Sequence, residues 1–329
     1  MTTPFALLAT AAAALLASAG ALAADVTMRI SHQFPPTHQT AKNLEQFATD
    51  VKAATGGKVE VQIFGSEQLY KATQNHAAVA RGQVEAAAIL NFQWGGTLPD
   101  MVVTTIPYLM TSADKLKKFP DSEAARLLDA KMASKGVKNI AWIVDANDGI
   151  FTSAKAPLVR PEDFKGVKIR GLSKLFDTGL SAMGASPAAM PGSEVYQALQ
   201  TGVIDAGLTG VEAAYARRFY EVQKFGVASP LFTAYDNLIV NPAWWNGLPA
   251  ELRKAIEGAA QKAAHRSLPD TDDIPPELIK QLRDKGMNVT VLNKVQQKAV
   301  ADVMQPAMIK AFNDSTPDGA KLIELINKL

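Results

Sequence analysis

The 329-residue sequence contains no cysteine. This absence excludes disulfide bonds, thiolate metal sites and a cysteine nucleophile. The formal net charge at pH 7 is only +2, so nothing favours a nucleic acid or an anionic membrane as partner. The sequence also lacks both the Gly-x-Gly-x-x-Gly and the Walker patterns, which removes the grounds for proposing a bound dinucleotide or ATP.

Motifs for catalysis are missing as well. The segment 171–175 (GLSKL) differs from a nucleophile elbow because Leu175 replaces the second glycine, which the sharp turn requires. The four histidines form neither a His-Glu-x-x-His motif nor an i, i+4 pair. We therefore expect a protein that is no enzyme, with no catalytic residue, no metal site and no cofactor.

Long apolar runs are absent except at the N-terminus. Residues 5–24 are uncharged and apolar, and they contain Ala21-Leu22-Ala23, the small-x-small pattern that signal peptidase cleaves. We predict a signal peptide over residues 1–24, cleaved after Ala23 or Ala24, and a periplasmic location. A retained membrane anchor is the alternative, although the run is short and rich in small residues.

The rest of the chain alternates strand and helix patterns. Period-two alternation predicts strands over 26–31 and 59–64, with a helix over 40–54 between them. A second helix then leads into the apolar strand 86–90, and the loop 91–99 follows. Further helices are expected over 248–267, 278–287 and 294–312. This order is typical of an α/β protein, and the 47% hydrophobic content suffices for about two domains.

Two distant segments share one pattern. Residues 79–86 (VARGQVEA) and 199–206 (LQTGVIDA) each suggest a helix that ends at a glycine and leads directly into a strand. The glycines, Gly82 and Gly202, fall at the position after a helix where a positive φ is common. Two domains of similar build would explain the likeness, and chance is the alternative because such corners are common.

Arg170 is the most distinctive residue of the sequence. Val167 and Ile169 alternate with Lys168 and Arg170 before Gly171 ends the predicted strand. Ligands bind at strand ends of open α/β sheets, and a guanidinium can hold a carboxylate with two parallel hydrogen bonds. On local sequence alone, a solvated or ion-paired surface arginine is the alternative.

Three segments carry a resemblance to a known family: PEDFKGVKIRG (161–171), MGASPAAMPGSEVYQALQTGVIDAG (183–207) and FYEVQKF (219–225). In this order they resemble the DctP-type solute-binding proteins of TRAP transporters. The resemblance implies a two-lobed periplasmic-binding-protein fold with crossing strands and a long interlobe helix. It also implies capture of a small organic acid, which a TRAP permease then takes up, driven by an ion gradient. A secreted enzyme on the same scaffold and ligand presentation to a sensor kinase are the alternatives.

The same resemblance suggests a division of the chain. Lobe I would comprise residues 25–147 and 236–275, and lobe II residues 148–235 and 276–329. We expect a monomer whose lobes close over the ligand.

The resemblance places Arg170 at the family's carboxylate-binding arginine. Thr209 stands where the family often has asparagine, and Gly192 stands where an aromatic residue is common. Asp145 and Asp148 lie where a second arginine is frequent. We therefore expect Arg170 to be the only arginine in the cleft, and the ligand to carry one carboxylate on a longer or ringed body.

Further candidates for the wall of the ligand site follow from their positions in the chain. They are Gln33, Tyr70, Lys71, Asn91, Phe92, Trp94, Ser173, Tyr235 and Asp236. Packing in the core or between the lobes is the alternative for the aromatic residues. Lys71 is the residue that could bring a second positive charge into the cleft.

Overall fold

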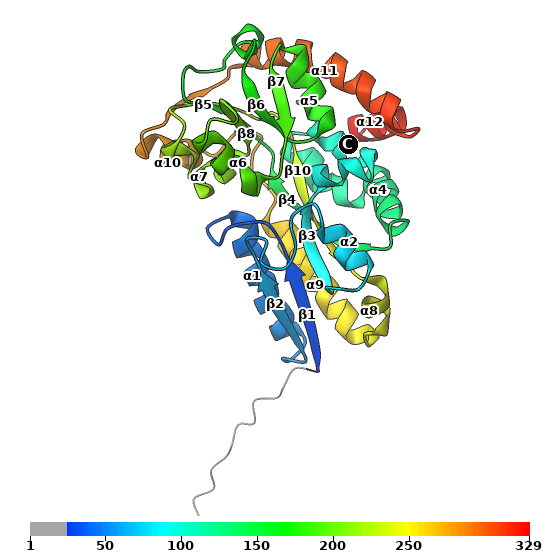
Figure 1. Cartoon of the computed structure of the whole chain (residues 1–329). Coiled ribbons are helices and arrows are strands. Elements are labelled where there is room, and N and C mark those ends of the chain that lie inside the picture. The colour runs from blue at the N-terminus through cyan, green and yellow to red at the C-terminus, as the bar shows by residue number, and fades with distance from the viewer. Residues whose placement is uncertain (1–24) are drawn as a thin grey trace, which may run out of the picture.

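The computed structural model describes residues 25–329, so the predicted signal peptide lies outside the described residues. Two β-sheets organise the chain, with strand orders β2-β1-β3-β10-β4 and β11-β9-β5-β8-β6-β7. Figure 1 shows the first sheet in the lower half of an elongated molecule and the second in the upper half. This architecture agrees with the predicted two-lobed α/β fold.

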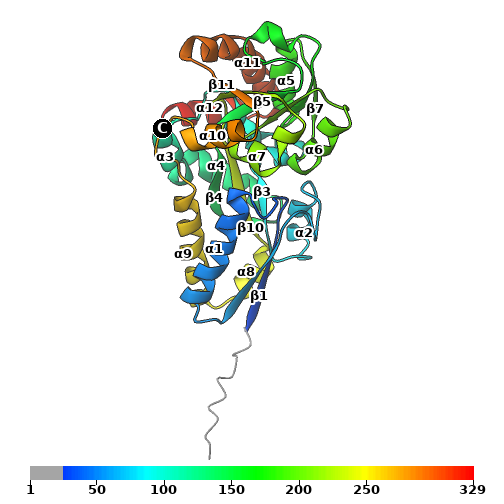
Figure 2. The ribbon, with the colours of Figure 1, turned by 90° about the vertical axis from the view of Figure 1, so that its left-hand side faces the viewer.

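The first sheet begins with the predicted β-α-β-α-β unit. Its strands are β1 (Val26–Ser31), β2 (Val59–Phe64), β3 (Ala86–Leu90), β4 (Lys138–Ala146) and β10 (Ala234–Val240). β1 pairs in parallel with β2 and β3, whereas β10 runs antiparallel to both β3 and β4. The helices around this sheet are α1 (Gln39–Ala54), α2 (Asn75–Ala80), α8 (Pro242–Gly247) and α9 (Ala250–Arg266). α1 and α9 pack side by side along it (Figure 2).

The second sheet is also mixed. Its strands are β5 (Gly149–Ser153), β6 (Lys168–Gly171), β7 (Ser186–Ala189), β8 (Ala206–Thr209), β9 (Phe225–Ser229) and β11 (Asn288–Val291). The helices around it are α5 (Lys174–Ala182), α6 (Gly192–Gln200), α7 (Val211–Ala216), α10 (Pro276–Asp284) and α11 (Lys294–Ser315). Parallel pairing of β6 with β7 and β8 brings the carboxyl ends of these three strands together.

The chain crosses between the sheets three times, and two of these crossings are short. Residues 147–148 lead from β4 to β5, and residues 230–233 lead from β9 to β10. Short crossings of this kind are where two lobes can hinge. The exact lobe boundaries stay a prediction.

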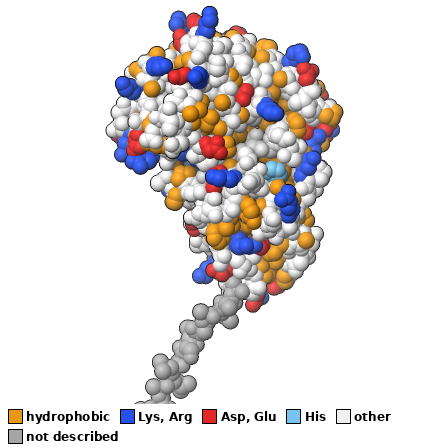
Figure 3. Space-filling view, viewed as in Figure 1, with side chains coloured by type: hydrophobic (Ala, Val, Ile, Leu, Met, Phe, Trp, Pro, Cys, Tyr) orange, Lys and Arg blue, Asp and Glu red, His pale blue; other side chains and the backbone are white. Residues whose placement is uncertain are grey.

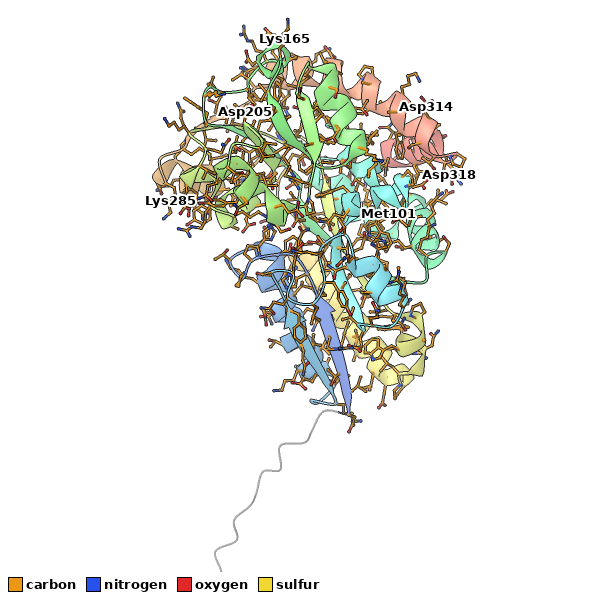
Figure 4. The ribbon with its side chains drawn as sticks, viewed as in Figure 1. Met101, Lys165, Asp205, Lys285, Asp314 and Asp318 are labelled. Carbon is orange, nitrogen blue, oxygen red and sulfur yellow. The ribbon has the colours of Figure 1, made fainter. Side chains whose placement is uncertain are left out.

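The C-terminal helices connect the two halves. α11 packs on α5 of the second sheet, and α12 (Gly319–Asn327) packs on α4 (Glu123–Ala133), which contacts β4 of the first. Lys131 of α4 lies 3.1 Å from Asp100 and 2.6 Å from Asp318, which fixes the start of α12. Figure 4 shows Asp318 at the side of the molecule and Met101, a fully buried core residue, near its centre.

Most predicted elements are confirmed within two or three residues. Gly82 and Gly202 follow α2 and α6 with φ of 70° and 73°, as the repeated pattern predicted. The expected loop 91–99 is instead largely 3₁₀-helical, over Asn91–Gly96 and from Pro99 on. On the face shown in Figure 3, basic and acidic side chains are interspersed, in keeping with the small net charge.

Candidate functional site

A small cavity lies between the ends of strands from the two sheets. The first sheet contributes the loop after β1, the end of β3 and the end of β4, and the second contributes the ends of β6 and β8 with α7. Its volume of about 20 Å³ is room for one or two water molecules. Small-molecule pockets usually measure about 300–1,000 Å³, so we expect the two halves to separate before a ligand enters this cavity.

Arg170 reaches this cavity from β6, as the strand-end argument predicted. The residue is only 2% exposed, and its Nε donates to the carbonyl of Met190 at 3.1 Å while Nη1 donates to the carbonyl of Leu208. Burial, and secondarily the charge of Arg217, lower the pKa of Arg170 to about 9, so it stays charged at neutral pH. Two carbonyls orient the guanidinium but do not neutralise it.

Gly171 explains how β6 can end next to a carboxylate. A Cβ atom at this position would lie 1.5 Å from Oδ1 of Asp177, so any residue other than glycine here would displace the Asp177 side chain. Burial raises the pKa of Asp177 to about 6, against a hydrogen bond from the backbone of Ala189. The Asp177 carboxyl group therefore favours the charged form of Arg170 but forms no ion pair with it within 4.0 Å among the described residues.

A second arginine, Arg217, lines the same cavity, so the expectation that Arg170 would be alone is wrong. Arg217 follows α7 directly. No ion pair within 4.0 Å joins it to a carboxylate in the part of the chain that the structure describes. Its side chain lies against Gly192, because a Cβ atom there would be 3.0 Å from the guanidinium carbon. The space that an aromatic residue would take at position 192 is filled by an arginine.

Carboxyl groups gather on the other side of the cavity. Asp145 at the end of β4 and Asp236 in β10 share the hydroxyl of Thr40, at 3.0 and 2.9 Å. Burial raises the pKa of Asp145 to about 6 and the pKa of Asp236 well above its ordinary value, the latter also because Asp145 lies close. Like charges this close do not both ionise readily, so each carboxyl group disfavours ionisation of the other.

Two further acids extend this cluster. Asp148 accepts the N–H of Val211 at 2.8 Å, and burial raises its pKa to about 6. Glu212 accepts the N–H of Gln39 at 3.1 Å, and burial raises its pKa to about 7. Asp145 lines the small cavity, whereas Asp148 lines only a neighbouring cavity of about 390 Å³, together with Asp145 and Glu212.

His38 is a neutral member of the cavity wall. Its Nδ1 accepts the N–H of Thr40 at 3.2 Å, so the proton resides on Nε2, which lies 3.5 Å from Glu212 and 3.8 Å from Asp145. Burial lowers the pKa of His38 well below its ordinary value. The residue can therefore donate one hydrogen bond toward these acids but adds no positive charge.

Four of the predicted ligand-binding residues line the cavity: Arg170, Thr209, Gly192 and Phe92. The ring of Phe92 lies 5.9 Å from the Arg170 guanidinium carbon. Phe92 also lines a larger neighbouring cavity of about 430 Å³, where Ser173 is found. The hydroxyl of Ser173 accepts the N–H of Phe176 and so caps α5.

Within the described chain, the other candidates do not line the small cavity. Asn91 is held by bonds to Met101, Thr104 and the N–H of Tyr235, and Lys71 is exposed and pairs with Glu67 at 3.2 Å. The remaining four also lie outside its wall: Gln33, Tyr70, Trp94 and Asp236. Gln33 is buried, and both polar atoms of its side-chain amide lack a protein partner.

Tyr235 belongs to a cluster of aromatic rings. For the aromatic candidates, such packing was the alternative to a place in the wall of the ligand site. Its ring lies 5.0 Å from that of Phe119 and 5.6 Å from that of Trp142. This packing fixes β10 against β4, close to the crossing between the sheets.

Over residues 25–329 no set of three or more His, Cys, Asp or Glu side chains is placed to hold a metal ion. In the same residues, no helix combines the length and hydrophobicity needed to span a bilayer.

An arginine at a strand end, on a cleft between two α/β halves, defines a two-lobed ligand-binding protein. Residues 30–315 match the bacterial extracellular solute-binding protein family 7, also called DctP. The chain belongs to this family of solute-binding proteins, as the sequence motifs suggested.

Three relatives illustrate the match. The C4-dicarboxylate-binding periplasmic protein DctP of Rhodobacter capsulatus is 33% identical, over 77% of this chain and 76% of its own. A TRAP periplasmic solute-binding protein from Desulfovibrio salexigens, with bound orotic acid, superposes with a TM-score of 0.84 at 28% identity, covering 92% of this chain and 97% of its own. DctP7, a Bordetella pertussis extracytoplasmic solute receptor that binds pyroglutamic acid, superposes with a TM-score of 0.83 at 26% identity, covering 91% of this chain and 99% of its own.

Proposed function

We propose that this protein captures a small organic acid in the periplasm through Arg170 and delivers it to a TRAP permease. The observation that carries the proposal is the buried Arg170 guanidinium, which carbonyls orient but no carboxylate within 4.0 Å neutralises in the described chain. A ligand carboxylate would supply the missing charge with charge-assisted hydrogen bonds.

The relatives support this class of ligand. Their names include C4-dicarboxylates, orotic acid and pyroglutamic acid, all of which carry at least one carboxylate. They are binding proteins rather than enzymes, which favours capture over catalysis. Gly192, Thr209 and Phe92 complete the ligand site in this proposal.

The remaining parts of the proposal follow from the sequence. We propose that cleavage after Ala23 or Ala24 releases a monomeric protein with lobe boundaries near residues 147, 235 and 275. The mass of the mature protein purified from periplasm tests the cleavage site, and its sedimentation coefficient tests the oligomeric state.

A thermal-shift screen of organic acids tests the binding function. A ligand at 100 times its dissociation constant adds about 2.7 kcal/mol to the free energy of unfolding. We expect at least one acid to stabilise the wild type but not Arg170→Met, which keeps the bulk and removes the charge. Arg160→Met, which changes an exposed arginine paired with Asp163, is the matched control. Equal stabilisation of wild type and Arg170→Met would refute the role of Arg170.

A further inference from the structure

The Arg170 and Arg217 guanidinium groups rest on one short segment of chain. Nε of Arg170 lies 3.1 Å from the carbonyl oxygen of Met190, and the Arg217 guanidinium carbon lies 3.0 Å from the Cβ position of Gly192. Because Met190 and Gly192 are only two residues apart, these contacts put both positive groups at the same end of the cavity. In this structure that cavity has room for only one or two water molecules.

This arrangement is electrostatically incomplete. Like charges at the edge of one small cavity repel each other, and within the described residues no carboxylate pairs with either arginine within 4.0 Å, although Asp145 and Glu212 attract Arg217 from farther away. The charge of Arg217 is also among the causes that lower the pKa of Arg170. One anionic group placed between the two guanidinium groups would relieve the repulsion and satisfy free donors on both.

We propose that Arg217 is a second ligand-binding residue and that Arg217 and Arg170 bind the same carboxylate as a clamp. Gly192 leaves the space that the Arg217 side chain occupies. This inference rests on the proposed function and deepens it. The opposite wall carries Asp145, so a second carboxylate of the ligand would face like charge there. The clamp together with Asp145 therefore favours acids that carry one carboxylate group over acids that carry two.

Isothermal titration of wild type and Arg217→Ala tests the clamp with three probes: orotate and pyroglutamate, which carry one carboxylate each, and succinate, which carries two. We expect Arg217→Ala to weaken every probe that binds by at least about 30-fold, since it removes one partner of a desolvated charge pair. We also expect the same loss for one-carboxylate and two-carboxylate probes. A loss confined to succinate would mean that the two arginines hold different carboxylates.

Arg218→Asn is the matched control, because Arg218 is the exposed neighbour of Arg217 and asparagine tolerates its φ of 60°. We expect it to leave the affinities unchanged. If it weakened binding as much as Arg217→Ala, general surface charge would replace the clamp as the explanation.

A double-mutant cycle tests the role of Gly192. A methyl group added by Gly192→Ala meets the Arg217 guanidinium, so we expect weaker binding in the wild-type background and no further effect in Arg217→Ala. Equal effects of Gly192→Ala in both backgrounds would overturn the link between the two residues.

The melting temperature without ligand separates a binding role from a structural one. Removing Arg217 ends its repulsion of Arg170 but also its attraction to Asp145 and Glu212, so we expect the melting temperature of ligand-free Arg217→Ala to change little. A lowered melting temperature would show that Arg217 stabilises the fold instead. If some probe binds the wild type but binds Arg217→Ala equally well, the clamp is wrong while organic-acid capture stands; if none binds the wild type, the proposed function itself is in doubt.

Discussion

Glu212 offers a direct test of the charge network around the cavity. Burial, and secondarily the charge of Asp145, raise its pKa from 4.5 to about 7, and Lys42 and Arg217 oppose this rise. We predict that Glu212→Gln makes the free energy of unfolding less dependent on pH between about pH 5 and pH 8.

The sign follows from proton binding. A carboxyl group whose pKa is raised by folding keeps its proton in the folded state while the unfolded state ionises, so stability falls as the pH rises from 4.5 toward 7. At 1.36 kcal/mol per pKa unit, the full loss from Glu212 is roughly 3 kcal/mol, of which about 2–3 kcal/mol falls between pH 5 and pH 8. Glutamine cannot ionise, so the variant escapes this loss.

Urea unfolding of wild type and Glu212→Gln near pH 5 and pH 8 measures the effect. A hydrogen bond lost in the variant, such as that from Gln39, lowers stability at both pH values alike, so the difference between the two pH values isolates the ionisation. As the pH rises from 5 to 8, we expect the free energy of unfolding of the variant to increase by about 2–3 kcal/mol relative to that of the wild type. Glu257→Gln, at an exposed glutamate 3.9 Å from Lys138, is the control and should show no such gain. A gain near zero for Glu212→Gln would refute the claim that burial raises the pKa of Glu212 in the folded protein.

Two further predictions concern closure and the acid pair. Small-angle scattering should show a smaller radius of gyration with saturating ligand, because the cavity of about 20 Å³ must open to admit one; an unchanged radius would indicate a rigid site. Thr40→Val should lower the free energy of unfolding by about 1–3 kcal/mol, because it leaves the buried Asp145 and Asp236 carboxyls without their shared hydroxyl. Chemical denaturation checks this, and Thr49→Val, at an exposed position of α1, should cost much less.

Local sequence patterns predicted the fold well because they report backbone requirements. Period-two alternation located β1 and β2, and the glycines after α2 and α6 adopt the positive φ that their position required. The place of Arg170 at the cavity was also predicted, because ligands bind at strand ends of open α/β sheets and because the family resemblance pointed to this arginine rather than to Lys168 of the same strand.

Arg217 could not be found in this way. It is the first of two adjacent arginines after α7, and nothing in the local sequence tells which of them turns toward the cavity. The glycine at 192 showed that a side chain was missing but not what filled its space. Both facts depend on contacts between segments about 25 residues apart, which only the folded chain brings together.

The distribution of charge between the two halves has a consequence for how a ligand is captured. Arg170 and Arg217 both come from elements of the second sheet, whereas Asp145 and His38 come from β4 and the β1–α1 loop of the first. Hydrogen bonds from Gln39 to Glu212 and from Ser193 to Glu67 join the halves in this closed form.

We propose that, when these bonds break and the halves separate, both arginines stay together on the second sheet while Asp145 moves away with the first. An incoming acid then meets two positive groups without the competing carboxylate of Asp145, which favours fast association. Closure afterwards brings Asp145 and His38 against the rest of the ligand. Selection between acids therefore belongs to the closing step, because only then does a second negative charge on the ligand meet Asp145.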